Sequence, residues 1–276
     1  MTGRHAMTSA PRDVGFRDAL RERAFRALYI AETTSILGDQ LARVALSVLV
    51  FSRTGSAADT AITYALTFLP AILGGAVLSG ISDRLPRRAV LIGCDILRAV
   101  LVGLMVLPGL PLAVLLLLLA VVVFINPAFT AAEVAFLATI LEGDRYRAAT
   151  GLRMMTSQLA QVAGFAVGGT VVATLGSHWG LAIDALSYAA SAVLIAAGTR
   201  SVLPRADGRS AGAATSSAAV KQPIRTLFVD PRVRALVALT ALAGFFITPE
   251  GLAAPYAAHL GGGAGWVGAL MAAIPL

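Results

Sequence analysis

Seven long apolar runs dominate the sequence and constrain what it can fold into. They span residues 25–51, 61–80, 89–107, 112–132, 152–175, 181–199 and 235–258, and an eighth begins near Trp266. About 20 apolar residues are enough for a helix to cross the hydrocarbon core of a bilayer. The chain is 57% hydrophobic and only 13% charged, whereas ordinary soluble domains carry about 25% charge. We therefore predict an all-α, polytopic membrane protein.

The basic residues are distributed unevenly among the connections between these runs. Of the 22 Lys and Arg residues, 19 lie in the N-terminal arm and in the second, fourth and sixth connections, or within two residues of them. Short loops rich in Lys and Arg remain on the cytoplasmic side of a membrane. We therefore predict a multi-pass protein of the inner (plasma) membrane with a cytoplasmic N-terminus.

The order of runs and polar stretches predicts four regions. Residues 1–24 form a cytoplasmic arm, and residues 25–199 form a bundle of six transmembrane helices. Residues 200–232 are rich in Ala, Ser and Gly and are typical of a flexible linker. Residues 233–276 are expected to hold helix 7 and the start of helix 8 of a second, partial bundle, because the chain ends inside an apolar segment; this indicates a truncated or partial sequence.

A short amphipathic helix is expected between runs four and five. Residues 133–147 mix charges with apolar residues at helical spacing. This pattern is typical of a helix that lies on the membrane surface, here on its inner side.

The second connection is the most specific motif in the chain. It reads Gly-Ile-Ser-Asp-Arg-Leu-Pro-Arg-Arg over residues 80–88. Small residues permit a tight turn between two membrane helices, and a carboxylate such as Asp83 can cap a helix or pair with a neighbouring arginine. A plain basic anchor on the cytoplasmic side is the alternative interpretation.

This loop resembles the signature of the major facilitator superfamily, Gly-x-x-x-Asp-Arg-x-Gly-Arg-Arg/Lys. Four residues match it position by position: Asp83, Arg84, Arg87 and Arg88. Ser79 stands at the first glycine position, with Gly80 next to it, and Pro86 stands at the second. The resemblance implies a six-helix N-terminal bundle made of two inverted three-helix repeats. It also implies that the loop latches the two bundles of the complete fold in the outward-facing state.

Two further segments carry the resemblance toward one branch of the superfamily. Residues 35–46 resemble the first helix of the proton-coupled branch that exports drugs, macrolides and siderophores. Residues 164–169 are similar to the antiporter signature Gly-Pro-x-x-Gly-Gly, with Phe165 in place of the proline. Within them, Gly164 and Gly168 are four residues apart, which also permits close helix packing without any transport role, and Gly169 follows directly.

Three charged residues stand inside the first run. Charges in hydrocarbon are costly and usually face a cavity or each other. Asp39 lies about 18 Å along the helix from Ala27, near the middle of the bilayer, with Glu32 seven residues before it and Arg43 four residues after it. Two interpretations remain open. Asp39 and Arg43 form a buried pair that fixes the helix, or Asp39, and less so Glu32, take up and release a proton during transport.

Other polar residues inside the runs are weaker candidates. Asp95 and Arg98 are one turn apart in run three, and we expect them to join the charge cluster of the motif loop in a structural role. Gln158 and Gln161 in run five are candidates for a substrate cavity. Glu250 in run seven is a further cavity candidate, and a plain residue at the outer mouth is its alternative.

The sequence lacks the motifs of several other functions. It has no Walker motif, no nucleophile elbow and no spacing of its three histidines that predicts a zinc site. The single cysteine, Cys94, excludes an intramolecular disulfide. The basic residues form no groove-sized patch for nucleic acid. We therefore expect no enzyme activity, no metal, no cofactor, no nucleic acid and no obligate protein partner.

The predicted function is secondary active transport across the lipid bilayer. The expected process is proton-driven efflux of amphipathic small molecules by alternating access between two bundles. A facilitator of metabolite uptake, the membrane subunit of an ATP-driven pump and a fragment that transports nothing are the alternatives.

Overall fold

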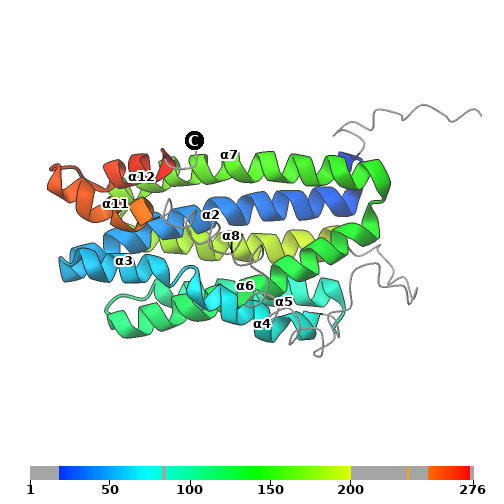
Figure 1. Cartoon of the computed structure of the whole chain (residues 1–276), viewed down its shortest axis with the longest axis horizontal. Helices are drawn as coiled ribbons and strands as arrows, with labels where there is room; N and C mark the ends of the chain where they lie inside the picture. Colours follow the sequence, from blue (N-terminus) through cyan, green and yellow to red (C-terminus); the bar gives the residue numbers. More distant parts are fainter. Residues whose placement is uncertain (1–18, 83–84, 200–234, 236–247, 274–276) are drawn as a thin grey trace, which may run out of the picture.

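The computed structural model describes residues 19–82, 85–199, 235 and 248–273. These residues form long helices that run side by side (Figure 1). Most of the predicted N-terminal arm, the predicted linker over 200–232 and the loop residues Asp83 and Arg84 lie outside the described part of the chain.

The described helices follow the predicted apolar runs. In chain order they are α2 (Arg23–Thr54), α3 (Ala57–Ala65), α4 (Leu69–Ser82), α5 (Arg87–Met105), α6 (Leu112–Ile140), α7 (Gly143–Leu175), α8 (Ser177–Gly198), α11 (Thr248–His259) and α12 (Ala264–Ala272). Within the described part of the chain, five segments are long and apolar enough to cross a membrane: Arg23–Thr54, Ala57–Gly75, Leu112–Ile140, Gly143–Leu175 and Ser177–Gly198. The expectation of an all-α, polytopic membrane fold is therefore confirmed.

Two segments differ from the sequence-based expectation. The second run is not one continuous helix: α3 ends at Ala65 and α4 begins at Leu69. The separate surface helix predicted over residues 133–147 is wrong. Helix α6 continues to Ile140, and α7 begins at Gly143 after a two-residue connection. The charges between residues 133 and 147 suggested a surface position, but Glu133 is buried by contacts with neighbouring helices.

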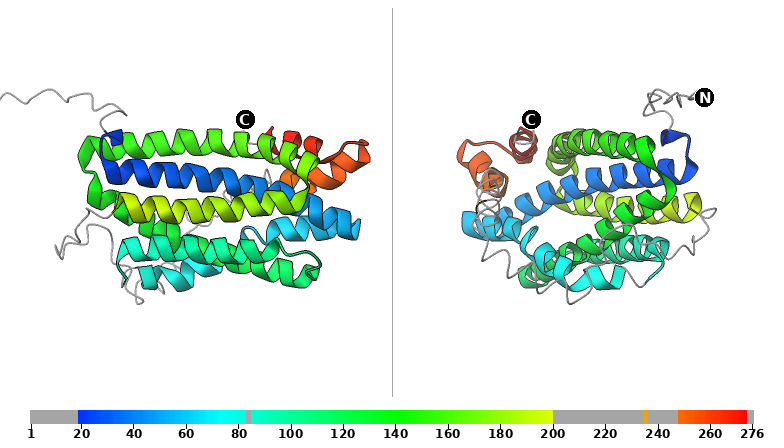
Figure 2. Two further views of the ribbon diagram at one scale, coloured as in Figure 1. Left: turned by 180° about the vertical axis from the view of Figure 1, so that it is seen from behind. Right: turned by 45° about the vertical axis from the view of Figure 1, so that its right-hand side comes forward.

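Helix α2 lies at the centre of the packing. It contacts α7, α8 and α3, and the remaining helices follow in a chain of contacts in which α8 packs on α5, α5 on α6 and α6 on α4 (Figure 2). Helix α11 packs on α3, and α12 packs on α7. We call the end of the bundle where α2, α5 and α7 begin the basic end, after Arg23, Arg87 and Arg145.

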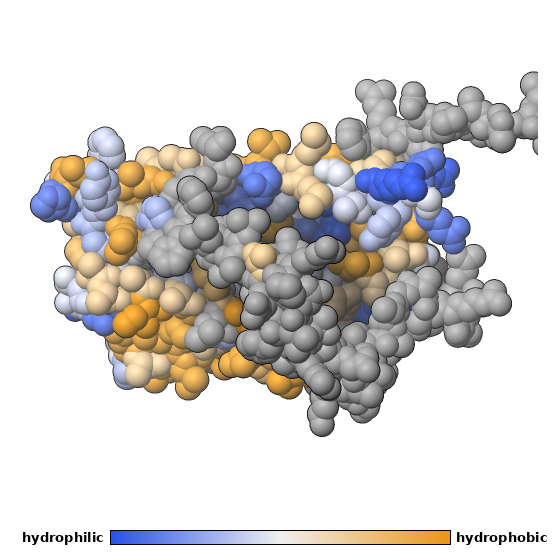
Figure 3. Space-filling view, in the orientation of Figure 1, coloured by the Kyte–Doolittle hydropathy of each residue, from blue (hydrophilic) through white to orange (hydrophobic). Residues whose placement is uncertain are grey.

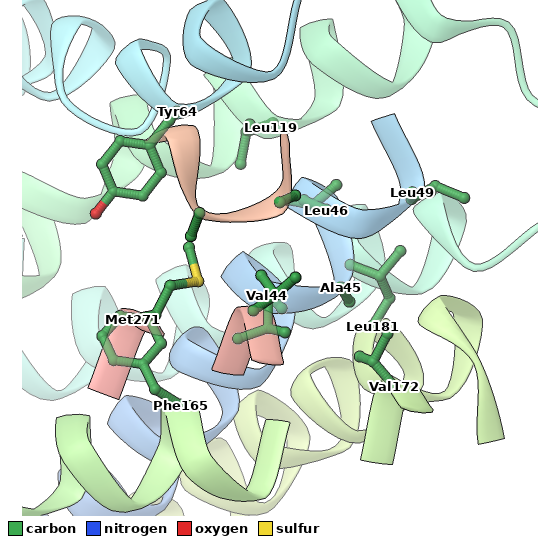
Figure 4. Packing of buried hydrophobic residues seen from close by; sticks show 14 of the residues in the cluster. Val44, Ala45, Leu46, Leu49, Tyr64, Leu119, Phe165, Val172, Leu181 and Met271 are labelled. Carbon is green, nitrogen blue, oxygen red and sulfur yellow. The ribbon is translucent and has the colours of Figure 1, made fainter. Parts of the chain in front are cut away.

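Apolar side chains fill the space between these helices away from the basic end. Figure 4 shows residues of α2, α3, α6, α7, α8 and α12 converging there, with Met271 of α12 beside Phe165 of α7. Both side chains are almost fully buried. This cluster joins α11 and α12 to α2, α3, α5, α6, α7 and α8.

The outer surface is also apolar. Figure 3 shows hydrophobic residues over the lower part of this face, where α3, α4 and α6 lie in Figure 1. Large apolar side chains on α4, including Ile72, Leu73 and Val77, are more than half exposed. Such a continuous apolar surface suits lipid and not water.

Candidate functional site

Asp39 occupies the middle of α2 and faces α8. The hydroxyl of Tyr188 on α8 donates a hydrogen bond of 2.5 Å to Asp39 Oδ1. Arg43 does not form the predicted ion pair with Asp39 in the described structure. Its guanidinium lies 5.9 Å from the centre of the Phe68 ring instead. The carboxylate in the middle of the bundle is therefore bound by a neutral phenol, because the packing of α2 on α8 turns it toward Tyr188.

A second carboxylate lies beside this contact. Asp184 is 2% exposed, and it accepts a long hydrogen bond of 3.4 Å from Ser187 Oγ. Its Oδ1 would lie 2.6 Å from a Cβ atom at Gly38, the residue before Asp39. The absence of a side chain at Gly38 is what lets α8 bring Asp184 against the backbone of α2. Asp184 is therefore buried and hydrogen-bonded, although it lies only a few residues from the outer end of the run 181–199.

A third carboxylate extends this buried polar group into α5. Asp95 accepts a hydrogen bond of 2.5 Å from Ser191 Oγ on α8 and pairs with Arg98 Nη1 at 3.5 Å. Arg98 Nη2 donates to Asn126 Oδ1 on α6 at 3.0 Å. The guanidinium also lies over the rings of Phe129 and Tyr188. Asp95 and Arg98 thus link α5 with α6 and α8, and the loop residues that we expected them to join lie outside the described chain.

We call Asp39, Asp95, Arg98, Asp184 and Tyr188 the central polar cluster. Its members in the described structure are three carboxyl groups, one phenol and one cation, Arg98. Buried charges are tolerated in a membrane protein when they are paired or hydrogen-bonded. A cluster with more carboxyl groups than cations can bind a proton at low energetic cost, because the proton removes an uncompensated charge.

A second charged group lies nearer the basic end. Arg153 of α7 binds both oxygens of Glu32 on α2, at 2.6 Å and 2.7 Å. Its Nη2 also lies 2.8 Å from Glu133 Oε2 on α6. Three helices are therefore joined through one guanidinium, in the bidentate geometry that arginine favours. We call this set the Glu32–Arg153–Glu133 cluster.

The two arginines of the motif loop at the start of α5 bind the ends of neighbouring helices. Arg87 Nη1 donates to the carbonyl of Ala135 on α6 at 2.8 Å. Arg88 donates to Thr199 Oγ1 at 2.9 Å and to the carbonyl of Ala196 at 2.8 Å. Gly80 lies near the end of α4. In this structure the described arginines of the loop therefore hold helices of their own bundle together.

The glycines of α7 face two different neighbours. A Cβ atom at Gly164 would lie 2.8 Å from the Gln40 side chain, and one at Gly168 would lie 3.1 Å from Leu41 Cα, both on α2. A Cβ atom at Gly169 would lie 2.8 Å from Gly268 Cα on α12. The motif thus allows close packing of α7 against α2 on one side and against α12 on the other.

The predicted cavity residues lie apart from one another. Gln161 Nε2 donates to Gln158 Oε1 at 3.0 Å on the exposed face of α7. Glu250 of α11 is 7% exposed, and its Oε2 has no hydrogen-bond partner among the described residues. Among those same residues, no three His, Cys, Asp or Glu side chains are grouped so as to hold a metal ion.

A comparison with known protein families decides what kind of bundle this is. The family profile of the Major Facilitator Superfamily matches residues 28–276, which is most of the chain. The chain belongs to this superfamily. This membership supports a general role in membrane transport.

A comparison with curated proteins agrees with this assignment. The chain is similar to the Bacillus subtilis (strain 168) protein named "Uncharacterized MFS-type transporter YkuC". The two are 27% identical over 185 residues, which cover 64% of this chain and 42% of the relative. The matched segment therefore spans less than half of the relative's length.

Sequence reasoning within the superfamily missed three residues of the site. Tyr188 and Arg153 carry no sequence pattern that marks them as site residues, and the charges around Glu133 favoured a surface helix. The signal that marks Glu133 is its position one residue after the apolar run 112–132. An acidic residue that continues the helical pattern of such a run is a candidate for a buried ion pair.

Proposed function

We propose that this superfamily member exports amphipathic small molecules and is driven by proton entry. The observation that carries the proposal is the position of Asp39, whose carboxylate is hydrogen-bonded to the phenol of Tyr188 and lies beside the buried Asp184. A carboxylate without a cation as its direct partner can exchange a proton without first breaking an ion pair. Asp39 is therefore the residue to which we assign proton uptake and release.

The exposed surface of α7 supports an amphipathic substrate. Met154, Met155 and Leu159 are between 63% and 71% exposed, and the hydrogen-bonded pair of Gln158 and Gln161 lies on the same helix. Methionine is flexible and polarisable, so a surface that contains it adapts to ligands of different shape. A facing second bundle would enclose this surface during alternating access.

The distribution of basic residues supports one orientation of the bundle across the membrane. We place the basic end and the N-terminus in the cytoplasm, because loops with Lys and Arg remain there. The chain then spans the plasma membrane with Asp39 near its middle and the Glu32–Arg153–Glu133 cluster closer to the cytoplasm.

Transport of a fluorescent amphipathic dye tests the proposal. Cells that express the chain are expected to accumulate less dye than control cells, and a protonophore should abolish the difference. In the variant Asp39→Asn the carboxylate is replaced by an amide of the same size, and dye export should fall at least tenfold while the protein stays in the membrane. Asp144→Asn is the matched control, because its side chain is 53% exposed at the start of α7.

The same assay separates the alternatives. Increased dye accumulation would identify an uptake facilitator instead. Unchanged accumulation with protein present in the membrane would contradict transport by this chain. Undiminished export by Asp39→Asn would remove this residue from the mechanism.

A further inference from the structure

The Glu32–Arg153–Glu133 cluster contains one more negative than positive group. Glu32 and Glu133 each bring a carboxylate, and Arg153 brings the single guanidinium that binds both. The side chain of Glu133 is 5% exposed, against 12% for Arg153 and 17% for Glu32. With both carboxyls ionised, a net negative charge would lie mostly out of contact with water. Such an arrangement is unfavourable in a medium of low polarity.

Other charged groups near Glu133 do not remove this imbalance. Arg98 of α5 is a further cation toward the middle of the bundle, and it is paired with Asp95. Arg87, also on α5, donates to the backbone carbonyl of Ala135 and to no carboxylate among the described residues. Helix α4, which packs on α6, has no charged residue between Leu69 and Ser82.

The two oxygens of the Glu133 carboxyl group have different surroundings. Oε2 lies 2.8 Å from Arg153 Nη2. Oε1 is buried and has no hydrogen-bond partner among the described residues. A buried carboxylate oxygen normally accepts a hydrogen bond, because leaving it unpaired costs the energy of its lost hydration. A proton on the Glu133 carboxyl group removes the excess charge, and a neutral carboxyl group costs less to bury without full hydrogen bonding than a carboxylate does.

We infer that Glu133 is a second proton-binding site of this protein, distinct from Asp39 and served by the shared Arg153. A proton from water binds the Glu133 carboxylate and gives a neutral carboxylic acid. The attraction between Arg153 and Glu133 weakens, and Arg153 keeps its two hydrogen bonds to Glu32. Loss of the proton restores the shared arrangement. The more exposed Glu32 and Arg153 mark the side from which water reaches the site.

The inference deepens the proposed function and depends on it for its role in transport. Arg153 stands on α7, which also contacts α12 through Gly169. The proton on Glu133 therefore changes how firmly the helix that touches the second bundle is bound to α6. Proton binding itself, however, can be measured without any substrate.

Infrared spectroscopy of the purified full chain in lipid nanodiscs tests the site. At mildly acidic pH, the spectrum of the wild type minus that of Glu133→Gln should contain the C=O stretch of a protonated carboxyl group. The matched spectrum with Asp144→Asn should contain only carboxylate bands, because that side chain is exposed to water. If dye export fails while this band is present, the proton site stands and the proposed transport does not.

One result would overturn the inference. If the wild type minus Glu133→Gln spectrum contains carboxylate bands alone, Glu133 is permanently ionised and the cluster is only a structural ion pair. Should Glu133→Gln not be recovered from the membrane, Glu133→Asp replaces it. The protonated-carboxyl band must then shift in frequency, and an unshifted band would equally overturn the inference.

Discussion

The two ends of α7 are held in different ways. Near the basic end, Arg153 binds α2 and α6 through hydrogen-bonded ion pairs of 2.6 to 2.8 Å. Toward the other end, Gly169 meets Gly268 of α12 with no side chain between the two backbones. The first contact is strong and specific, and it joins α7 to α2 and α6. The second is a close contact between glycines of α7 and α12 that involves no charged group.

The difference suggests a division of roles along one helix. Ion pairs depend on direction and break at a high cost when one partner is lost. A contact between glycines depends on dispersion and on close approach, and it has no charged group to separate when helices move. Helix α7 is therefore anchored to α2 and α6 by ion pairs at one end, and at the other end it packs on α12 through glycines without a charged contact.

Of the three substitutions considered, Arg153→Ala should cause the largest loss of stability. The substitution leaves the buried carboxyl group of Glu133 and the half-buried one of Glu32 without their cation, and the cost of breaking a buried pair is about 3–5 kcal/mol. Thermal unfolding in detergent should show a clearly lower melting temperature than that of the wild type. A melting temperature equal to that of the wild type would mean that the ion pairs do not hold α7 in place.

Gly169→Ala should have an intermediate effect. Its new methyl group would lie 2.8 Å from Gly268 Cα, so α7 and α12 must separate, and such overpacking costs about 1–3 kcal/mol. Gly151→Ala on the same helix is the matched control, because nothing lies within 4 Å of its new Cβ atom. The control should be neutral or stabilising, since alanine favours a helix by about 1 kcal/mol over glycine. Equal unfolding temperatures for the two variants would show that the glycine contact is not tight.

Arg147→Ala should have the smallest effect. Arg147 pairs with Asp144 at 3.0 Å, only six residues before Arg153 in the chain, but its side chain is 82% exposed. Exposed ion pairs contribute about 0.2–1 kcal/mol. Unfolding curves of the Arg147 and Arg153 variants, recorded side by side, therefore measure how much burial increases the contribution of an arginine ion pair to stability. A loss as large as that of Arg153→Ala would contradict the role of burial.

Much of the fold follows from the sequence. The length of the apolar runs predicts membrane-spanning helices, because about 20 apolar residues match the thickness of a bilayer. The residues of the loop around Arg87 gave the superfamily, which the match over residues 28–276 supports. Both features are local, so a linear pattern is sufficient to find them.

The partners of the polar residues did not follow in the same way. Asp39 and Arg43 have the spacing of an ion pair within one helix, yet Asp39 binds Tyr188, 149 residues away. Arg153 and Glu32 are 121 residues apart. The rotation of each helix about its own axis decides which helix a side chain faces, and it depends on all the packed neighbours together. Almost uniformly apolar helices offer too little contrast between faces for the sequence to reveal that rotation.

The short connection between α6 and α7 has a mechanical consequence. Only Leu141 and Glu142 separate the two helices, and Gly143 starts α7 with a φ of 57°. Two extended residues reach at most about 7 Å, so the link has almost no slack. A tilt or a slide of α7 must therefore displace the end of α6 as well. The two helices are mechanically coupled at Gly143 and move together.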